Sequence, residues 1–339
     1  MRIGLNPNKD IKNFKDKFSH QVIIPVFIPS HDDYFMDALK ILEKSLNSIF
    51  KTVHSRTFIS VVSNGSSKKT ESFLNTLYEN GSIHELIFTE NIGKLNSIYK
   101  ALGGHNIPLV TITDADVIFV SGWQEETFKL FTNFPKTGTV GLIPQFLSYQ
   151  SHCHNLLFDF LFSKDLKFGK VEDPKGLKHF YNSLGWKDDY PRSRLKYILY
   201  LEINRIKAIV GSGHVVATYR RELFNTVKFF NPYKMGGNSE SLLDELASKF
   251  GLYRFTTVKN YAYHLGNKLD KDEIEGLDSE IPFLNKNKVY PISLNSINRT
   301  NKFVYIAKKV IIQFILKSHK LRMLYLNYLG LPKDVRKTF

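Results

Sequence analysis

The feature that most constrains the fold is an alternation of short apolar runs with amphipathic segments after the first twenty residues. The run HQVIIPVFIP (20–29) predicts a buried strand that ends at Pro29. Further strands are predicted at 58–62, 84–89 and 108–113, and helices at 37–50, at 95–102 and around Leu74. Strands that alternate with helices at this spacing predict an α/β fold, with a mostly parallel sheet, right-handed crossovers and helices on its faces.

Polar residues follow the carboxyl ends of three predicted strands. Asn64 follows the second strand and Lys94 the third, and the sequence TITDADV places Asp114 and Asp116 directly after the fourth. Ligands of open α/β sheets bind beyond the carboxyl ends of the strands. We therefore expect these side chains to converge on one edge of the sheet.

The two aspartates indicate a metal site. Asp114 and Asp116 are two residues apart, so both carboxylates point the same way if the segment is extended. Two close carboxylates raise each other's pKa unless a cation neutralises them. Mn²⁺ or Mg²⁺ suits such a pair, because these ions combine one or two carboxylates with water and phosphate oxygens. The alternative is a turn in which Asp114 caps the next segment and Asp116 faces solvent.

Six landmarks occur in a fixed order along the chain: VIIPVFIP, VVSNGSS, ENIGK, TITDADV, GSGHVVATYRRELF and YAYHLGN. This ordered set covers roughly residues 20 to 267 and resembles the family 2-like GT-A glycosyltransferases. The resemblance implies a GT-A (Rossmann-like) fold. It also implies a metal-dependent enzyme that moves a sugar from a nucleotide diphosphate to a glycan or lipid-linked acceptor, with inversion at the anomeric carbon.

The resemblance implies roles for residues on the donor side. Phe27 and Ile28 would lie along the nucleobase and ribose, Asn64 at the base edge, and Lys94 near the base or the phosphates. Many relatives carry an aspartate where this chain has Ser63 or Asn64, which leaves the identity of the base open.

The resemblance also implies a metal set. Asp114 and Asp116 would form the metal-binding D-x-D motif, with Asp114 also in contact with the donor, and His264 would be a further metal ligand. The alternative for His264 is a hydrogen-bonded histidine of the core.

The family's acidic motif before a helix supplies the catalytic base, and it has no direct copy here. The segment NSESLLDELASKFG offers Glu240, Asp244 and Glu245. The DEL sequence precedes a helix that ends at Gly251, so Asp244 is the first choice for the base and Glu245 the second. The alternative for each is a solvated helix carboxylate.

The second half of the chain is expected to bind the acceptor. We predict a nucleotide-sugar-binding half over 1–144, an acceptor-binding half over 145–270 with an irregular insertion at 145–205, and a C-terminal extension over 271–339. In relatives the GSGH segment lines the acceptor side, which implicates Gly213 and His214. A simple turn before a strand is the alternative for that segment.

The C-terminal segment from Lys302 to Phe339 holds nine Lys or Arg and one acidic residue, a net charge of +8 out of +15 for the chain. Apolar residues recur there at helical intervals: Phe303, Ala307, Val310, Phe314, Leu321, Tyr325 and Tyr328. The pattern is typical of a basic amphipathic helix on an anionic membrane surface. The alternative is a helix that packs its apolar face on the domain.

The composition also indicates the cellular compartment and argues against two alternative functions. A single cysteine, a polar amino terminus and no long apolar stretch predict a cytoplasmic protein, which the basic C-terminal segment would bring to the inner face of the membrane. A sugar-phosphate nucleotidyltransferase is disfavoured, because no glycine-rich phosphate loop follows the first strand. A basic membrane- or nucleic-acid-binding protein would leave the D-x-D motif unexplained. No nucleic-acid recognition motif stands out, so we expect no nucleic-acid partner.

Overall fold

A computed structural model describes residues 4–7, 9, 17–186, 189–227, 230–235, 240–269, 289 and 294–339. The predicted alternation of strands and helices is present in its first half. The elements are β1 (His20–Val26), α1 (Ala38–Thr52), β2 (Thr57–Asn64), α2 (Lys68–Glu79), β3 (Glu85–Thr89), α3 (Lys94–Leu102) and β4 (Leu109–Thr113). Each begins and ends within a few residues of the prediction.

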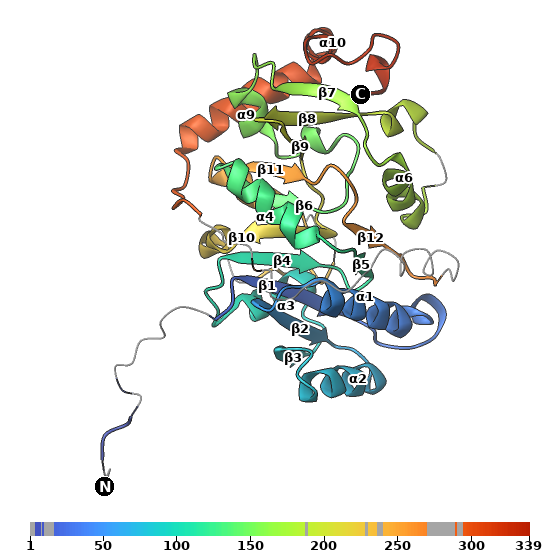
Figure 1. Cartoon of the computed structure of the whole chain (residues 1–339), viewed down its shortest axis with the longest axis vertical. Helices are drawn as coiled ribbons and strands as arrows, with labels where there is room; N and C mark the ends of the chain where they lie inside the picture. Colours follow the sequence, from blue (N-terminus) through green and yellow to red (C-terminus); the bar gives the residue numbers. More distant parts are fainter. Residues whose placement is uncertain are drawn as a thin grey trace.

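A ten-stranded sheet runs the length of the molecule, in the order β3-β2-β1-β4-β10-β6-β11-β9-β8-β7 (Figure 1). The second-half strands are β6 (Thr137–Gly141), β7 (Leu166–Lys170), β8 (Tyr197–Ile203), β9 (Ile206–Val210), β10 (Val216–Arg220) and β11 (Tyr253–Thr256). The pairings make β10, β9 and β7 antiparallel to the other seven. The predicted α/β fold with a mostly parallel sheet is therefore confirmed.

Both faces of the sheet are covered, as the continuous apolar composition of β1 requires. Val22 and Ile24 of β1 belong to the same core cluster as Leu42 and Leu46 of α1. Ile23, between them, belongs instead to the cluster that holds the apolar residues of α3 and of α7 (Ser241–Lys249). The period of two along a strand thus sends alternate side chains into two cores.

Residues 145–205 were predicted to be irregular, but the structure shows ordered elements there. They form α5 (His154–Asp159), β7, α6 (Pro174–Ser183), a short 3₁₀ helix (Arg192–Leu195) and β8. The charged Asp-Pro sequence proves to be a helix start. Asp173 Oδ1 accepts a hydrogen bond from Gly176 N at 2.8 Å, and Pro174 occupies the first helical position.

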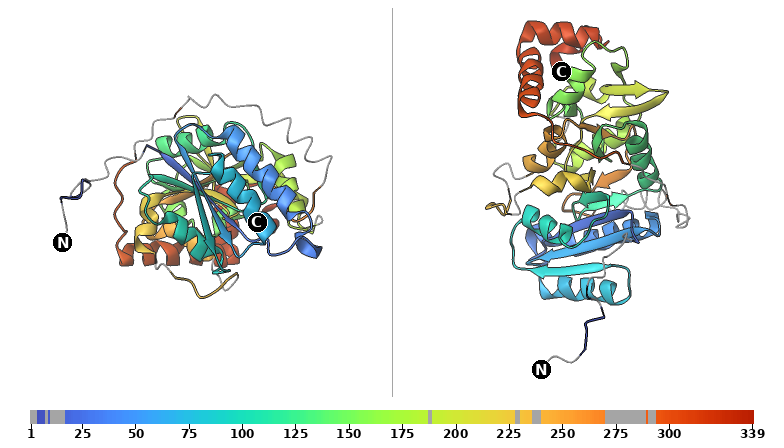
Figure 2. Two further views of the ribbon diagram at one scale, coloured as in Figure 1. Left: turned by 90° about the horizontal axis from the view of Figure 1, so that it is seen from below. Right: turned by 90° about the vertical axis from the view of Figure 1, so that its left-hand side faces the viewer.

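The C-terminal segment forms two helices, α9 (Lys302–Lys317) and α10 (His319–Tyr328). They lie at the β7 end of the sheet, opposite α2, in Figure 1 and in the right-hand view of Figure 2. Ile312, Leu326, Leu329 and Phe339 are buried in the same core as α5 and β8, so the segment is part of the fold. Residues 271–288 and 290–293 of the predicted extension lie outside the described residues, as does residue 270 before it. None of the described helices has the length and apolar character that crossing a membrane requires.

Candidate active site

Asp114 and Asp116 lie in a short connection between two strands. Asp114 follows β4, and its backbone N–H donates to Val215 O at 2.9 Å, just before β10. The apolar run that resumes after Asp116 is β5 (Val117–Phe119), which pairs with β12 (Ala262–His264) in a small antiparallel sheet. The chain therefore leaves the main sheet at the two aspartates and enters a second, buried sheet.

The small sheet brings His264 to Asp116. In its register His264 pairs with Val117, and His264 Nε2 lies 3.3 Å from Asp116 Oδ2. The other ring nitrogen, Nδ1, lies 2.8 Å from Ser183 Oγ at the end of α6. A hydrogen bond on the second ring nitrogen is the arrangement that orients metal-ligating histidines. Burial by itself lowers the pKa of His264, but the hydrogen bond and charge of Asp116 raise it above its usual value.

Lys94 connects the aspartates to the second half of the chain. Its Nζ lies 2.5 Å from Asp114 Oδ1 and 2.7 Å from Glu240 Oε1. Burial by itself lowers the pKa of Lys94, but the two carboxylates raise it above its usual value. Lys94 begins α3 after Gly93, whose φ is 90° and whose Cβ, if it had one, would lie 2.8 Å from Lys234 Cα. Only glycine fits there.

Glu240 in turn leads to a second charge cluster. Its Oε2 lies 3.1 Å from His214 Nε2, and His214 Nδ1 lies 3.1 Å from Asp244 Oδ2. Asp244 Oδ1 then accepts a hydrogen bond from the buried Arg254 of β11 at 2.5 Å. Arg254 also donates to the carbonyls of Ser212 and Ser151, so it anchors the backbone that precedes His214.

The pKa values within this cluster are shifted in opposite directions. Burial lowers the pKa of His214, but hydrogen bonds to Asp244 and Glu240, and their charges, raise it to about 9. The hydrogen bond from His214 and the charge of Lys94 lower the pKa of Glu240 to about 2, although burial opposes the shift. His214 is therefore protonated, and Glu240 ionised, throughout the neutral range.

The residues predicted for the donor side lie at the carboxyl ends of β1 and β2. The Phe27 ring is partly exposed and packs edge-on against Phe35 at a centroid distance of 5.8 Å, whereas Ile28 is buried. Asn64 is also buried, and its Oδ1 accepts from Ile92 N at 2.9 Å. Its observed contacts thus position the loop that carries Lys94, and its contact with a nucleobase stays a prediction.

Gly213, which the sequence predicts for the acceptor side, packs closely against the side chain of Gln145. A Cβ on Gly213 would lie 2.1 Å from the Gln145 side-chain nitrogen, so a side chain there would displace Gln145. This packing holds the backbone before His214 close to the loop that follows β6.

The structure does not bring Glu245 to the cluster. Its carboxylate bonds to Lys249 at 2.7 Å and to the Tyr305 hydroxyl at 3.0 Å, and thus faces α9. Sequence reasoning also missed two residues that shape the site, Arg254 and Ser183. The arginine inside the apolar strand YRFT was a usable signal, because a buried charge needs a partner. Ser183 carried no such signal.

The carboxylate oxygens of Asp114 and Asp116 are suitable ligands for a divalent cation. Among the described residues, no group of three or more His, Cys, Asp or Glu side chains is arranged as a ready-made metal site. However, Asp116 Oδ1 is buried without a hydrogen-bond partner, and buried carboxylate oxygens are rarely left so. An Mn²⁺ or Mg²⁺ ion would satisfy this oxygen, with the His264 imidazole available beside it.

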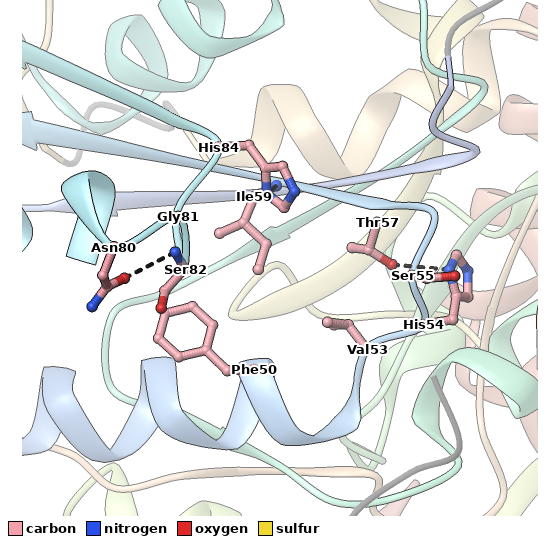
Figure 3. Close-up of a pocket in the computed structure, with 10 residues that line it drawn as sticks. All are labelled: Phe50, Val53, His54, Ser55, Thr57, Ile59, Asn80, Gly81, Ser82 and His84. Atoms are coloured by element: carbon pink, nitrogen blue, oxygen red, sulfur yellow. Dashed lines mark hydrogen bonds between the residues drawn. The ribbon is translucent and has the colours of Figure 1, made fainter. Parts of the chain in front are cut away.

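A separate cavity of about 320 Å³ lies at the other edge of the sheet (Figure 3). It is lined by the end of α1, by Thr57 and Ile59 of β2, and by the Asn80–His84 turn before β3. These are the amino ends of the parallel strands, opposite the edge where open α/β sheets bind ligands. The cavity is therefore not part of the charge network around Lys94.

Comparisons with known proteins give structural likeness only. No protein-family model matches the chain, and no curated protein sequence matches it. The mannosyltransferase PcManGT from Pyrobaculum calidifontis, solved with GDP-Man and Mn²⁺, aligns at 17% identity with a TM-score of 0.43. That alignment covers 71% of this chain and 55% of the mannosyltransferase, so this chain spans about half of that protein.

TarS from S. aureus also aligns. Its 1–349 fragment in complex with UDP-GlcNAc matches at 12% identity with a TM-score of 0.42, over 95% of this chain and 78% of the fragment. The same fragment in another crystal structure matches over 78% of this chain and 70% of its own length, also at 12% identity with a TM-score of 0.42.

The pKa of His214 predicts a pH dependence of stability. A folded-state value of about 9, above the unfolded value of about 6.5, means that the stabilisation is complete below pH 6.5 and is lost as pH rises through about 9. Over this pH range, we expect the free energy of unfolding, measured by urea denaturation, to fall about 1–2 kcal/mol more in the wild type than in His214→Gln. This difference is smaller than the pKa shift alone would give, because a third of the His214 side chain is exposed to solvent. Equal pH dependence of the two proteins would contradict the assignment.

Proposed function

We propose that this chain is a metal-dependent glycosyltransferase that moves a sugar from a nucleotide-diphosphate donor to a glycan or lipid-linked acceptor, with inversion. The observation that carries the proposal is the continuous network from Asp114 through Lys94 and Glu240 to His214. It joins the D-x-D motif to the segment predicted to line the acceptor. Two substrates that react with each other must meet at one place.

The donor half of the proposal rests on Phe27, Lys94 and the aspartates. The partly exposed Phe27 ring offers a flat surface for a nucleobase, just beyond the end of β1. Lys94 supplies a fixed positive charge at the edge of the sheet where a diphosphate would lie. Asp116 and His264, together with Asp114, would hold a divalent cation. When bound, the cation would supply positive charge that stabilises the departing diphosphate.

We propose Glu240 as the base that deprotonates the acceptor hydroxyl. Its side chain is 33% exposed, against 14% for Asp244, and it lies between the donor-side Lys94 and the acceptor-side His214. A carboxylate has about four acceptor positions, so its bonds to Lys94 and His214 leave room for a substrate hydroxyl. A donor diphosphate beside Lys94 would offset part of the positive charge that holds the pKa of Glu240 at about 2, and would thereby make Glu240 a stronger base. Asp244, the first choice from the sequence, neutralises the buried Arg254 and positions His214.

The acceptor is proposed only by class. A lipid-linked acceptor would agree with the membrane surface predicted for the basic C-terminal segment and with action at the cytoplasmic face of a membrane. A soluble glycan acceptor would need neither. A panel of nucleotide-sugars, tested for Mn²⁺-dependent hydrolysis, would identify the sugar and the nucleobase of the donor.

The metal proposal predicts the behaviour of Asp116→Asn. This variant should lose Mn²⁺-dependent binding of nucleoside diphosphates, and its transfer rate should fall at least about 100-fold. Loss of a metal ligand is expected to reduce activity at least as much as loss of a residue that supports a ligand. His264→Ala should lose less, since water can replace one ligand. Binding is measured by calorimetry with and without Mn²⁺, and Glu245→Gln, which faces away, is the matched control. Full transfer in EDTA would contradict the proposal.

The base proposal predicts a separation of two neighbouring carboxylates. Glu240→Gln should lower kcat by about 10²–10⁴-fold and leave donor affinity nearly unchanged, because a base acts in the chemical step. Asp244→Asn, unlike Glu240→Gln, should lower the melting temperature, because Arg254 would lose its carboxylate partner. If Asp244→Asn abolishes kcat at normal stability while Glu240→Gln stays active, the base is Asp244.

A further inference from the structure

The domain-facing side of α9 carries polar and charged groups. Lys308 is only 17% exposed, forms an ion pair with Asp159 of α5, and lies 5.5 Å above the Phe158 ring. Tyr305 donates its hydroxyl hydrogen to Glu245 at 3.0 Å and contacts His154 edge-on. With the buried Ile312, these residues occupy one face of the helix at the spacing i, i+3, i+7.

The solvent-facing side of α9 is apolar. Phe303 is 83% exposed and Phe314 66% exposed, with Ala307 and Val310 exposed between them. The four residues, at i, i+4, i+7 and i+11, form a single stripe along the helix, which we call the apolar stripe. Val304, Ile306 and Ile311 are also exposed beside it.

This arrangement departs from the usual one for a surface helix, although Ile312, Ile315 and Leu316 still pack on the core. Such helices place apolar residues on the core and charges in water, because exposed apolar area is unfavourable. Here a lysine faces the domain, and two phenylalanines face solvent on the same helix. Contiguous exposed apolar surface of this kind marks an interaction site. The helix can hold the stripe rigidly, since its other face is anchored on α5.

We propose that the apolar stripe docks on the surface of an anionic lipid bilayer. Exposed lysines stand at both ends of the stripe: Lys302 is the first residue of α9, Lys317 its last, and Lys320 follows in α10. Aromatic residues on one side and lysines around them are typical of helices that lie in the membrane interface. The inference does not rest on the proposed function.

Charge favours a bilayer over a second copy of the chain. Residues 302–339 carry a net charge of +8, so stripe-to-stripe contact would bring two strongly positive segments together. Anionic headgroups have the complementary charge, and each nearby lysine or arginine strengthens such binding about five-fold. A bilayer therefore satisfies both the apolar residues and the cations that flank them.

The test is sedimentation of the full chain with vesicles of phosphatidylcholine, with and without phosphatidylglycerol. We expect binding to the anionic vesicles, weakened at least about ten-fold in Phe303→Asn/Phe314→Asn, because two apolar side chains no longer enter the interface. Lys302→Gln/Lys317→Gln/Lys320→Gln should weaken it about five-fold for each lysine and reduce its salt sensitivity.

The matched control is Tyr78→Ser/Phe88→Ser, which removes two exposed aromatic residues from α2 and β3 at the opposite end of the sheet. It should bind like the wild type. The lysine variant keeps the test decisive if the phenylalanine variant loses stability. Failure of the wild type to bind anionic vesicles, or binding unaffected by both α9 variants, would overturn the proposal. So would a dimer, seen by sedimentation velocity without lipid, that the phenylalanine variant converts to a monomer.

Discussion

The Lys94 ammonium, held between the carboxylates of Asp114 and Glu240, is the interaction on which the candidate site depends. Asp114 directly follows β4 and Glu240 directly precedes α7, so one side chain links the two halves of the chain. Burial raises the pKa of Asp114, and the neighbouring Asp116 adds to this, while Lys94 opposes both. Removing one member leaves the others without a partner, and this costs less than the ~3–5 kcal/mol of a fully buried pair because Glu240 is 33% exposed.

The antiparallel strand β10 explains why donor-side and acceptor-side residues meet. It lies between β4 and β6, and Val216 at its start is paired with Thr113 at the end of β4. The segment before β10 therefore reaches the same edge as the residues after β4, which puts His214 within one side chain of the Lys94 cluster. A parallel strand in this position would have placed its preceding segment at the opposite edge.

Much of this arrangement could be predicted from the sequence, because apolar periodicity is local. The strands and helices up to β4 follow from it, and the position of Asp114 and Asp116 follows from the end of β4. The contact of Lys94 with Glu240 could not be predicted, since the two residues are 146 positions apart and neither has a local signal for the other. Likewise, the spacing of Phe303 and Phe314 predicts that they share a face of a helix. It does not predict which way that face points, because this depends on how Tyr305 and Lys308 bind the domain.

The central claim is that the network around Lys94 and the aspartates is where a metal and a nucleoside diphosphate bind together. The most direct measurement is anomalous diffraction at the manganese edge, from crystals grown with Mn²⁺ and a nucleoside diphosphate. We expect one strong anomalous peak in contact with Asp116 and His264, with diphosphate density extending from it toward Lys94. A peak elsewhere, or a nucleotide bound away from the carboxyl ends of β1 and β4, would contradict it.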